Sequence, residues 1–398
     1  MRVLMLTTPV PTHLTPLVPL AWALRAAGHE LLVAGQPDVL EAARCAGLNA
    51  VSIGTRFDLG AMLLAGLPDG VRPIELRGRP APEVMGEYGR VWMVHAERML
   101  PDYLHFARGF RPDLILADPL EYVALIVGGV LGVPVVQHRW GVDPISTPAR
   151  PKARLALAEA CRSVGLAGLP DPHVLLDPCP PSLQLPGVEP ATPLRCVPYN
   201  GGGAVPAWLG SELGEGRPGP RRVAVSVGGL TLVMHGVPFL RRLLWAFDGL
   251  PDVEAVATVD AVHREEIGPV PGNVRMIDPT PLNMFLGRCA AVVHHGGAGT
   301  SMSATDAGLP QLVLPQISDQ FAAGDRLAAR GAAIAIDDAA RQNDPAALRA
   351  ALAALLEDDS YAKAARELGR EMRDQPTPAR IAADLERLAR NRPNKEEL

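Results

Sequence analysis

The chain of 398 residues has few cysteines, few aromatic residues and no long apolar run. Its 5 cysteines are scattered without a CxxC pair, which is typical of a reducing compartment, and we assign them no chemistry. No stretch approaches the roughly 20 apolar residues of a membrane helix. The apolar start, Met1 to Leu6, stops at Thr7 and is too short for a signal peptide. We therefore expect a cytoplasmic protein without a membrane span.

A large excess of one charge is also missing, since the formal net charge is -5. No basic stripe is present, which makes nucleic acid an unexpected partner. The composition is 48% hydrophobic and 20% charged, as in folded proteins rather than disordered ones. The length is enough for two or three domains. A homodimer is compatible with these features.

Alternating strand and helix patterns fill the first half of the chain. The expected strands are residues 2–6, 30–34, 112–118 and 133–137, and the expected helices are 14–27, 37–46, 91–110 and 122–131. Residues 55–90 are rich in Gly, Pro and Arg with weak periodicity, and we interpret them as a mobile substrate loop with short helices. Such alternation predicts a parallel sheet covered by helices.

A second alternation follows a glycine- and proline-rich stretch. Strands are expected at 222–227, 254–259, 274–277, 291–294, 311–314 and 333–336, with a helix at 239–247. The α/β chain is therefore predicted to form an N-terminal domain (1–200), a linker (201–221), a C-terminal domain (222–375) and a helical tail (376–398) that packs back on the N-terminal domain. Ligands of such sheets bind outside the C-terminal strand ends, so we expect a cleft between the domains.

The strongest motif follows the strand at 291–294. It consists of His295, Gly296, Gly297, Ala298, Gly299 and Thr300, just ahead of a helix-like segment. Glycines let the backbone approach a ligand closely, and amide groups at a helix N-terminus favour an anion. The motif therefore predicts a phosphate site. His294 should point to the other side of the strand, because side chains alternate, and we give it a structural role.

A carboxylate and an amide follow the next strand, at Asp319 and Gln320. Together they can bind several hydroxyl groups of a sugar. The other interpretation of Asp319 is an N-cap for a helix that starts near Phe321, and both roles are compatible. A phosphate site followed by a sugar site indicates a nucleotide-sugar donor.

These motifs resemble the donor site of GT-B glycosyltransferases, specifically the actinobacterial enzymes that glycosylate antibiotics. The resemblance rests on His295–Thr300, Pro315-Gln316 and Asp319-Gln320, and it extends to the segments Pro11–Leu14 and Gly132–Pro134. It implies a GT-B fold, in which two Rossmann-like domains with parallel sheets face an interdomain cleft. It also implies a reaction without a metal or other cofactor, with a dTDP-sugar as co-substrate.

In this family, the residues that match the C-terminal motifs bind the donor. His295 and the backbone from Gly296 to Thr300 would hold the diphosphate, and Asp319 and Gln320 the sugar. The loop with Ser226 and Gly228 resembles a second phosphate contact, although a glycine pair after a strand is usually only a turn. The segment from Ile277 through Pro281 to Asn283 would lie under the nucleobase.

The acceptor side contains three candidate catalytic residues, His13, Asp118 and Asp143, and the first two come at or after the ends of predicted strands of the N-terminal sheet. In the family, the histidine that matches His13 deprotonates an acceptor hydroxyl, and imidazole suits this role because its pKa is near working pH. Asp118 ends a buried strand and would orient that histidine, or else cap a helix. The alternative for His13 is a capping or merely exposed histidine.

A closer resemblance, to C-glycosyltransferases of the urdamycin type, lies in the middle of the chain. It covers the segments His138–Pro144, Leu176–Gln184 and Val197–Gly201 and the tripeptide Pro281-Leu282-Asn283. It implies an aromatic polyketide acceptor, with Arg139 and Trp140 near it. Asp143 would be a candidate base that activates a phenol for attack by its ortho carbon. The other interpretation of Asp143 is an Asp-Pro turn residue.

We therefore predict an inverting glycosyltransferase that moves a deoxysugar from a dTDP-sugar to an aromatic polyketide in antibiotic biosynthesis, with C-glycosylation favoured. The first alternative is O-glycosylation of a polyketide or macrolide hydroxyl. The alternatives from other classes are a GT-B-like sugar-nucleotide epimerase and a non-catalytic auxiliary protein of a glycosyltransferase.

Overall fold

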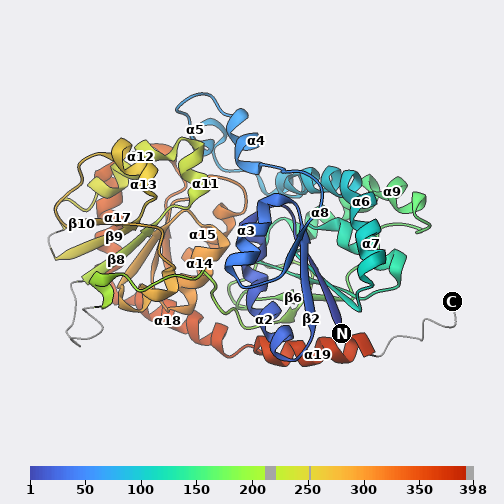
Figure 1. Cartoon of the computed structure of the whole chain (residues 1–398). Coiled ribbons are helices and arrows are strands. Elements are labelled where there is room, and N and C mark those ends of the chain that lie inside the picture. Colours follow the sequence, from blue (N-terminus) through green and yellow to red (C-terminus); the bar gives the residue numbers. More distant parts are fainter. Residues whose placement is uncertain (211–220, 251, 391–398) are drawn as a thin grey trace. The chain divides into compact units, whose positions relative to one another are not determined.

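A computed structural model describes residues 1–210, 221–250 and 252–390 of the chain (Figure 1). The chain folds into two compact units, each built on its own parallel sheet. Residues 211–220 of the predicted linker (201–221) lie outside the described residues. In the part of the chain that the structure describes, no helix combines the length and apolar character needed to cross a bilayer.

The sheet of unit 1 has seven strands among the described residues, in the order β3-β2-β1-β4-β5-β6-β7. Its strands are β1 (Arg2–Leu6), β2 (Glu30–Gly35), β3 (Ala50–Ser52), β4 (Leu114–Ala117), β5 (Val135–His138), β6 (Val174–Asp177) and β7 (Thr192–Pro193). Every residue of β4 and β5 is buried. Strands that are apolar on both faces need cover on both faces, which explains the continuous apolar runs in the sequence.

Helices connect these strands. They are α1 (Pro11–Leu14), η1 (Thr15–Leu17), α2 (Val18–Ala26), α3 (Pro37–Cys45), η2 (Pro82–Gly89), α6 (Arg90–Phe110), α7 (Tyr122–Leu131), α8 (Ser146–Ala156), α9 (Ala158–Ser163) and α19 (Pro378–Arg390). The helix α7 is almost wholly apolar and ends at Gly132, whose φ of 60° is the left-handed conformation that favours glycine at a helix C-terminus. Such a helix belongs in a core, and seven of its residues are buried.

The sheet of unit 2 has six strands among the described residues, in the order β10-β9-β8-β11-β12-β13. Its strands are β8 (Arg221–Ser226), β9 (Val253–Thr258), β10 (Val274–Ile277), β11 (Ala291–His294), β12 (Gln311–Val313) and β13 (Ala333–Ala335). One main core cluster, which includes Val225, Phe239, Leu243, Val293 and Leu352, lies on one side of this sheet. A smaller cluster includes Trp208, Phe285 and Val292.

The helical elements of unit 2 come from two separate stretches of sequence. They are α4 (Leu59–Ala65), α5 (Pro73–Arg77), α11 (Gly229–Thr231), the kinked segment η3 (Leu232–Gly236), α12 (Val237–Trp245), α13 (Ala261–Ile267), η4 (Leu282–Met284), η5 (Leu286–Arg288), α14 (Ala298–Asp306), α15 (Gln320–Ala329), α16 (Ala339–Gln342), α17 (Pro345–Glu357) and α18 (Asp359–Arg373). The second of these stretches, residues 202–373, supplies the whole sheet.

The chain crosses between the units more often than a division at residue 200 implies. The segment Leu59–Ala81, which was predicted as part of the N-terminal domain, belongs to unit 2 by its contacts. The described residues from Asp374 onward belong to unit 1, where α19 packs against α2 (Figure 1). Each unit therefore contains one segment that is distant in the sequence from the other residues of that unit.

Candidate active site

His13 and Asp118 of unit 1 come close together through a third residue, Thr8. Strands β1 and β4 are parallel neighbours, with Leu6 opposite Ala117, so the residues that follow them meet at one sheet edge. The hydroxyl oxygen of Thr8 lies 2.5 Å from Nδ1 of His13 and 3.1 Å from Oδ2 of Asp118. The backbone nitrogens of Thr8 and Leu120 also donate to the Asp118 carboxylate, at 2.7 and 2.9 Å. We call this arrangement the His13–Thr8–Asp118 relay.

The relay determines which nitrogen of His13 is free. Thr8 has one hydroxyl proton, and it donates that proton to Asp118. The Thr8 oxygen must then accept from Nδ1–H of His13, which assigns the proton to Nδ1 and leaves the lone pair on Nε2. The arrangement has the logic of a catalytic triad, with a hydroxyl inserted between the histidine and the carboxylate.

Burial changes the pKa values at both ends of the relay. It lowers the pKa of His13 to about 3, so the ring is neutral. Burial, followed by the charge of Glu121, raises the pKa of Asp118 to about 7, although the hydrogen bonds from Thr8 and Leu120 oppose the rise. Glu121 is itself fully buried and lies 3.4 Å from Nε2 of His95. Sequence reasoning missed Thr8 and Glu121, although both follow the ends of strands.

Aromatic rings surround His13. The Trp140 ring stacks on it at 3.9 Å between centroids, and the Trp92 ring meets it edge-on at 6.0 Å. Phe57 packs beside Trp92 at 5.5 Å. Trp140 thus lies next to the catalytic candidate, with one face of its ring stacked on His13. Its predicted contact with an acceptor stays a prediction.

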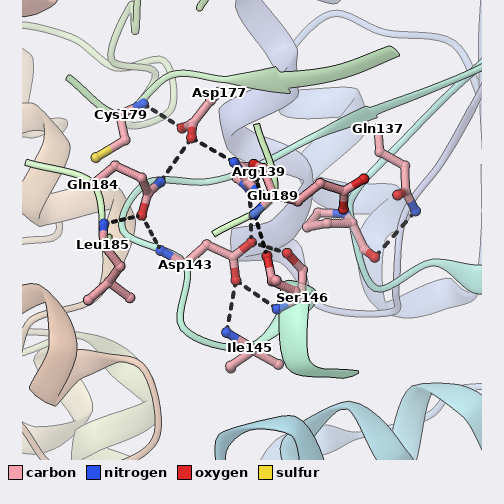
Figure 2. Close-up of polar contacts among 12 residues, drawn as sticks. Gln137, Arg139, Asp143, Ile145, Ser146, Asp177, Cys179, Gln184, Leu185 and Glu189 are labelled. Carbon is pink, nitrogen blue, oxygen red and sulfur yellow. Dashed lines mark hydrogen bonds and ion pairs between the residues drawn. The ribbon is translucent and has the colours of Figure 1, made fainter. Parts of the chain in front are cut away.

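Asp143 is a capping residue at the start of α8. Its Oδ1 accepts from the backbone nitrogens of Ile145 and Ser146 at 3.0 and 2.9 Å, and its Oδ2 accepts from the Ser146 hydroxyl (Figure 2). Arg139 contacts the same carboxylate at 3.3 Å, and the residue is 3% exposed. Asp143 thus has the partners expected of a turn residue, which was the alternative interpretation of the sequence.

Arg139 belongs to the scaffold of the loop after β5. Its guanidinium is 1% exposed and donates to Asp177 at 2.9 Å and to the carbonyl of Glu189 at 2.8 Å (Figure 2). Gln184 joins the same network through Asp177 and the backbone nitrogen of Asp143. The structure therefore gives Arg139 a structural role, and it offers no support for the predicted contact with an acceptor. Two of the segments that carry the resemblance to C-glycosyltransferases, His138–Pro144 and Leu176–Gln184, are thus linked by scaffold contacts.

His295 of unit 2 fits between two glycines. A Cβ atom at Gly228 would lie 2.6 Å from Cε1 of the His295 ring, and a Cβ at Gly297 would collide with its Nε2. Only glycine at both positions leaves room for the imidazole, which explains their place in the motif. The Gly228 loop follows β8 and the His295 loop follows the neighbouring β11, where His294 pairs with Ser226. Burial lowers the pKa of His295 to about 4, so the ring is neutral without a ligand.

The helix α14 begins immediately after His295 and its glycines. Gly297 is its N-cap residue, and Ser301 donates the first intrahelical hydrogen bond, to the Gly297 carbonyl at 3.0 Å. The backbone N–H groups of Ala298, Gly299 and Thr300 therefore have no acceptor within this helix. Donors of this kind form anion sites at helix N-termini, so the local geometry supports the predicted phosphate site.

The neighbouring His294 has a structural role. Its Nε2 lies 2.7 Å from Oε1 of Gln311, and its Nδ1 accepts from the backbone nitrogen of Gly296 at 2.9 Å. The residue is fully buried. Both ring nitrogens are thus satisfied, and His294 fixes the turn that presents His295.

The predicted sugar site lies on the loop between β12 and α15. Asp319 is the N-cap residue of α15, but its side chain makes no capping hydrogen bond to that helix. Gln320 folds back, so that its Oε1 accepts from the backbone nitrogens of Gln316 and Ile317 at 2.9 and 3.2 Å. A Cβ at Gly296 would lie 2.7 Å from the Gln320 carbonyl. The phosphate and sugar motifs therefore touch each other.

The predicted nucleobase segment lies at the end of β10. Ile277 is the last residue of this strand and packs against the smaller core cluster, while Pro281 is the N-cap residue of η4. Within the described residues, no group of three or more His, Cys, Asp or Glu side chains is arranged to hold a metal ion. Metal independence remains a prediction.

Comparison with known proteins shows the family to which this chain belongs. The N-terminal and C-terminal domain models of the erythromycin biosynthesis protein CIII-like family match residues 22–228 and 243–388. The chain belongs to this family. Tylactone mycaminosyltransferase of Streptomyces fradiae is 34% identical, over 98% of this chain and 92% of the relative. Elloramycin glycosyltransferase ElmGT of Streptomyces olivaceus is 37% identical, over 97% of each chain.

Solved structures agree with this membership. The spinosyn rhamnosyltransferase SpnG, complexed with thymidine diphosphate, has a TM-score of 0.85 and 39% identity, over 97% of this chain and 100% of that one. The glycosyltransferase VinC in complex with dTDP has a TM-score of 0.80 and 30% identity, over 98% and 100%. The chain is a glycosyltransferase with the two parallel α/β domains of the GT-B class, as the sequence predicted.

Proposed function

We propose that this family member is an inverting glycosyltransferase that moves a deoxysugar from a dTDP-sugar to a polyketide acceptor, with His13 as the base. The observation that carries the proposal is the position of Thr8 between His13 and Asp118. This position leaves Nε2 of His13 as a neutral proton acceptor and connects its other nitrogen to a carboxylate. Family membership supplies the reaction class, and the relay supplies the base.

The donor proposal rests on unit 2 and on the relatives. The SpnG and VinC complexes contain thymidine diphosphate, and other relatives are named as transferases of mycaminose, desosamine and TDP-daunosamine. The N-terminus of α14 and His295 supply donors for a diphosphate. As the bond from the anomeric carbon to the diphosphate breaks, negative charge grows on the leaving oxygen, and fixed donors lower that barrier. Asp319 and Gln320 would bind the sugar hydroxyls.

The proton transfer uses the relay of unit 1. The acceptor hydroxyl donates to Nε2 of His13, and its oxygen forms the bond to the anomeric carbon while the dTDP oxygen leaves with the bonding electrons. The proton ends on Nε2, and Asp118 stabilises the resulting imidazolium through Thr8. One displacement of this kind inverts the configuration at the anomeric carbon.

The acceptor proposal combines the aromatic surroundings of His13 with the relatives. Relatives are named for different acceptors, among them tylactone, aklavinone and the spinosyn aglycone. Trp92 beside His13, together with Phe57 that packs against Trp92, suits a planar ring, which favours an aromatic polyketide. We propose transfer to a hydroxyl oxygen, because Asp143, the group invoked for carbon attack, is occupied as a cap.

Transfer to carbon is the second candidate. It is favoured by the resemblance of the segment around Asp143 to C-glycosyltransferases, and deprotonation of a phenol by His13 also raises electron density at the ortho carbon. The epimerase and auxiliary-protein alternatives are less favoured. The chain belongs to a glycosyltransferase family and has the residues of both the acceptor-side and the donor-side candidate sites.

Incubation with dTDP-deoxysugars and a panel of tetracyclic aglycones tests the proposal. We expect dTDP release that depends on the aglycone, together with a glycoside that acid cleaves. A glycoside that survives acid would replace oxygen attachment with carbon attachment. A sugar nucleotide altered without any aglycone would contradict the transferase mechanism itself.

A further inference from the structure

A buried arginine from the first half of the chain lies behind the predicted sugar-binding loop of unit 2. Arg72 precedes α5, in the segment Leu59–Ala81 that packs with unit 2. It is 1% exposed, and its guanidinium lies over the Phe239 ring, with Cζ 4.3 Å from the ring centroid. Arginine is almost never fully buried without partners, so its contacts indicate why it is there.

The guanidinium of Arg72 is held by one carboxylate and three amide oxygens. Its Nη1 donates to Oε1 of Gln316 and of Gln342, both at 3.0 Å. Its Nη2 donates to Oε1 of Glu75 at 3.0 Å and to Oδ1 of Asn343 at 2.9 Å. The planar fork of an arginine can reach all four acceptors at once, whereas a lysine cannot.

Two of these partners fix the backbone of the loop that carries Asp319 and Gln320. Gln342 donates to the carbonyls of Pro315 and Ile336 at 3.0 and 2.8 Å, and Gln316 donates to the Leu314 carbonyl at 2.8 Å. The loop turns at Ser318, whose φ of 58° is in the left-handed region that is unfavourable for a non-glycine residue. Such a conformation persists only when the surroundings enforce it.

We propose that Arg72 is a positioning residue for the donor sugar. Through Gln316 and Gln342 it fixes the loop 315–320, so that Asp319 and Gln320 face the sugar in one arrangement. The segment Leu59–Ala81 lies within residues 55–90, which the sequence predicts as a substrate loop, and it thereby serves the donor site. This inference rests on the proposed function, since it assumes that the loop binds the sugar of a nucleotide donor.

The test compares the affinities of dTDP and dTDP-rhamnose by calorimetry, because dTDP lacks the sugar. In Arg72→Met, we expect the affinity for dTDP-rhamnose to fall about tenfold, the loss of roughly one hydrogen bond, while the affinity for dTDP stays unchanged. Asn343→Ala removes one acceptor and leaves the arginine buried, so it should give a smaller loss of the same kind. This milder variant keeps the test valid where Arg72→Met fails to fold.

Arg79→Met is the matched control. Arg79 also ties the segment Leu59–Ala81 to unit 2, through Asp325 and Asp337, but its side chain is 42% exposed and none of its ion pairs reaches Gln316 or Gln342. It should leave both affinities unchanged. Equal losses for dTDP and dTDP-rhamnose in Arg72→Met and Asn343→Ala, or no loss in either, would overturn the inference. A wild-type protein that binds neither nucleotide would instead contradict the proposed function.

Discussion

The hydroxyl of Thr8 lies between Nδ1 of His13, at 2.5 Å, and the Asp118 carboxylate, at 3.1 Å, so a threonine joins the two residues that the sequence predicts to act together. Because a hydroxyl has a single proton, this bridge determines the tautomer of the histidine. The proposed base and the residue proposed to orient it are therefore coupled through a group that can be removed without changing any charge.

Removal of this hydroxyl should impair catalysis rather than binding. In Thr8→Val, His13 loses the partner that holds its proton on Nδ1, and we expect kcat to fall by about 10²-fold, within the range for general-base catalysis, with little change in the KM of the acceptor. Thr8→Ser keeps the hydroxyl and should retain most of the activity. Steady-state kinetics of both variants check this, and equal activity of the two would rule out the bridge.

The pH dependence should follow Asp118. Its pKa is raised to about 7, whereas that of His13 is lowered to about 3, so the histidine stays neutral across the working range. As the pH falls through about 7, Asp118 gains a proton and can no longer stabilise the imidazolium. We expect kcat/KM to fall on the acid side with an apparent pKa near 7. A profile that stays flat down to about pH 5 would contradict the relay.

Unfolding does not explain such an acid limb. A carboxyl whose pKa is higher in the folded state than in the unfolded state binds protons preferentially in the folded state. Asp118 therefore adds stability below about pH 4, and that contribution is lost as the pH rises from about 4 to about 7. Thermal denaturation at pH 6 and pH 8 serves as the control, since this group by itself lowers the free energy of unfolding at the higher pH.

The glycines beside His295 provide a test of the donor site. In Gly297→Ala, the new Cβ would displace the His295 ring, and we expect the affinity for dTDP to fall as it does in His295→Ala. Gly287→Ala is the control, because no atom lies within 4 Å of its added Cβ. Calorimetric titration with dTDP measures all three variants. A Gly297→Ala protein that binds dTDP like the wild type would show that the ring position is unimportant.

The variant Asp143→Asn distinguishes a capping role of Asp143 from a role as the catalytic base. An asparagine can still accept from the start of α8, but the contact with Arg139 loses its charge. We expect a loss of about 1–2 kcal/mol in the free energy of unfolding, as for a weakened cap, and nearly unchanged kcat. Denaturant titration and kinetics together check this. A large drop in kcat with unchanged stability would restore the base role of Asp143.

Much of the fold was predictable because the apolar patterns in the sequence coincide with the strands and helices of the structure. The strands at Arg2–Leu6, Val274–Ile277 and Ala291–His294 have the predicted bounds, as does the helix Tyr122–Leu131. Apolar runs that end near a glycine or proline determine the bounds of these elements closely. His13 and Asp118 were predictable as neighbours for the same reason, since they follow strands of one parallel sheet.

The contacts that decide residue roles were not predictable. The partners of Arg139 at Asp177 and Glu189 lie far along the chain, so its burial could not be inferred from the motif around it. Arg72 lies in a stretch of weak periodicity, and nothing local indicates that an arginine is buried there. The role of Thr8 could not be inferred from the sequence, because a hydroxyl bridge depends on the distance between two side chains in space.

The most direct test of the account is dTDP release by the wild type and by His13→Ala, with and without a polyketide aglycone. We predict that the wild type releases dTDP and forms an equal amount of a glycoside with inverted configuration, only when the aglycone is present. His13→Ala should still bind dTDP but release almost none from the sugar nucleotide. Turnover by His13→Ala at the wild-type rate would contradict the central claim that His13 is the base of this glycosyl transfer.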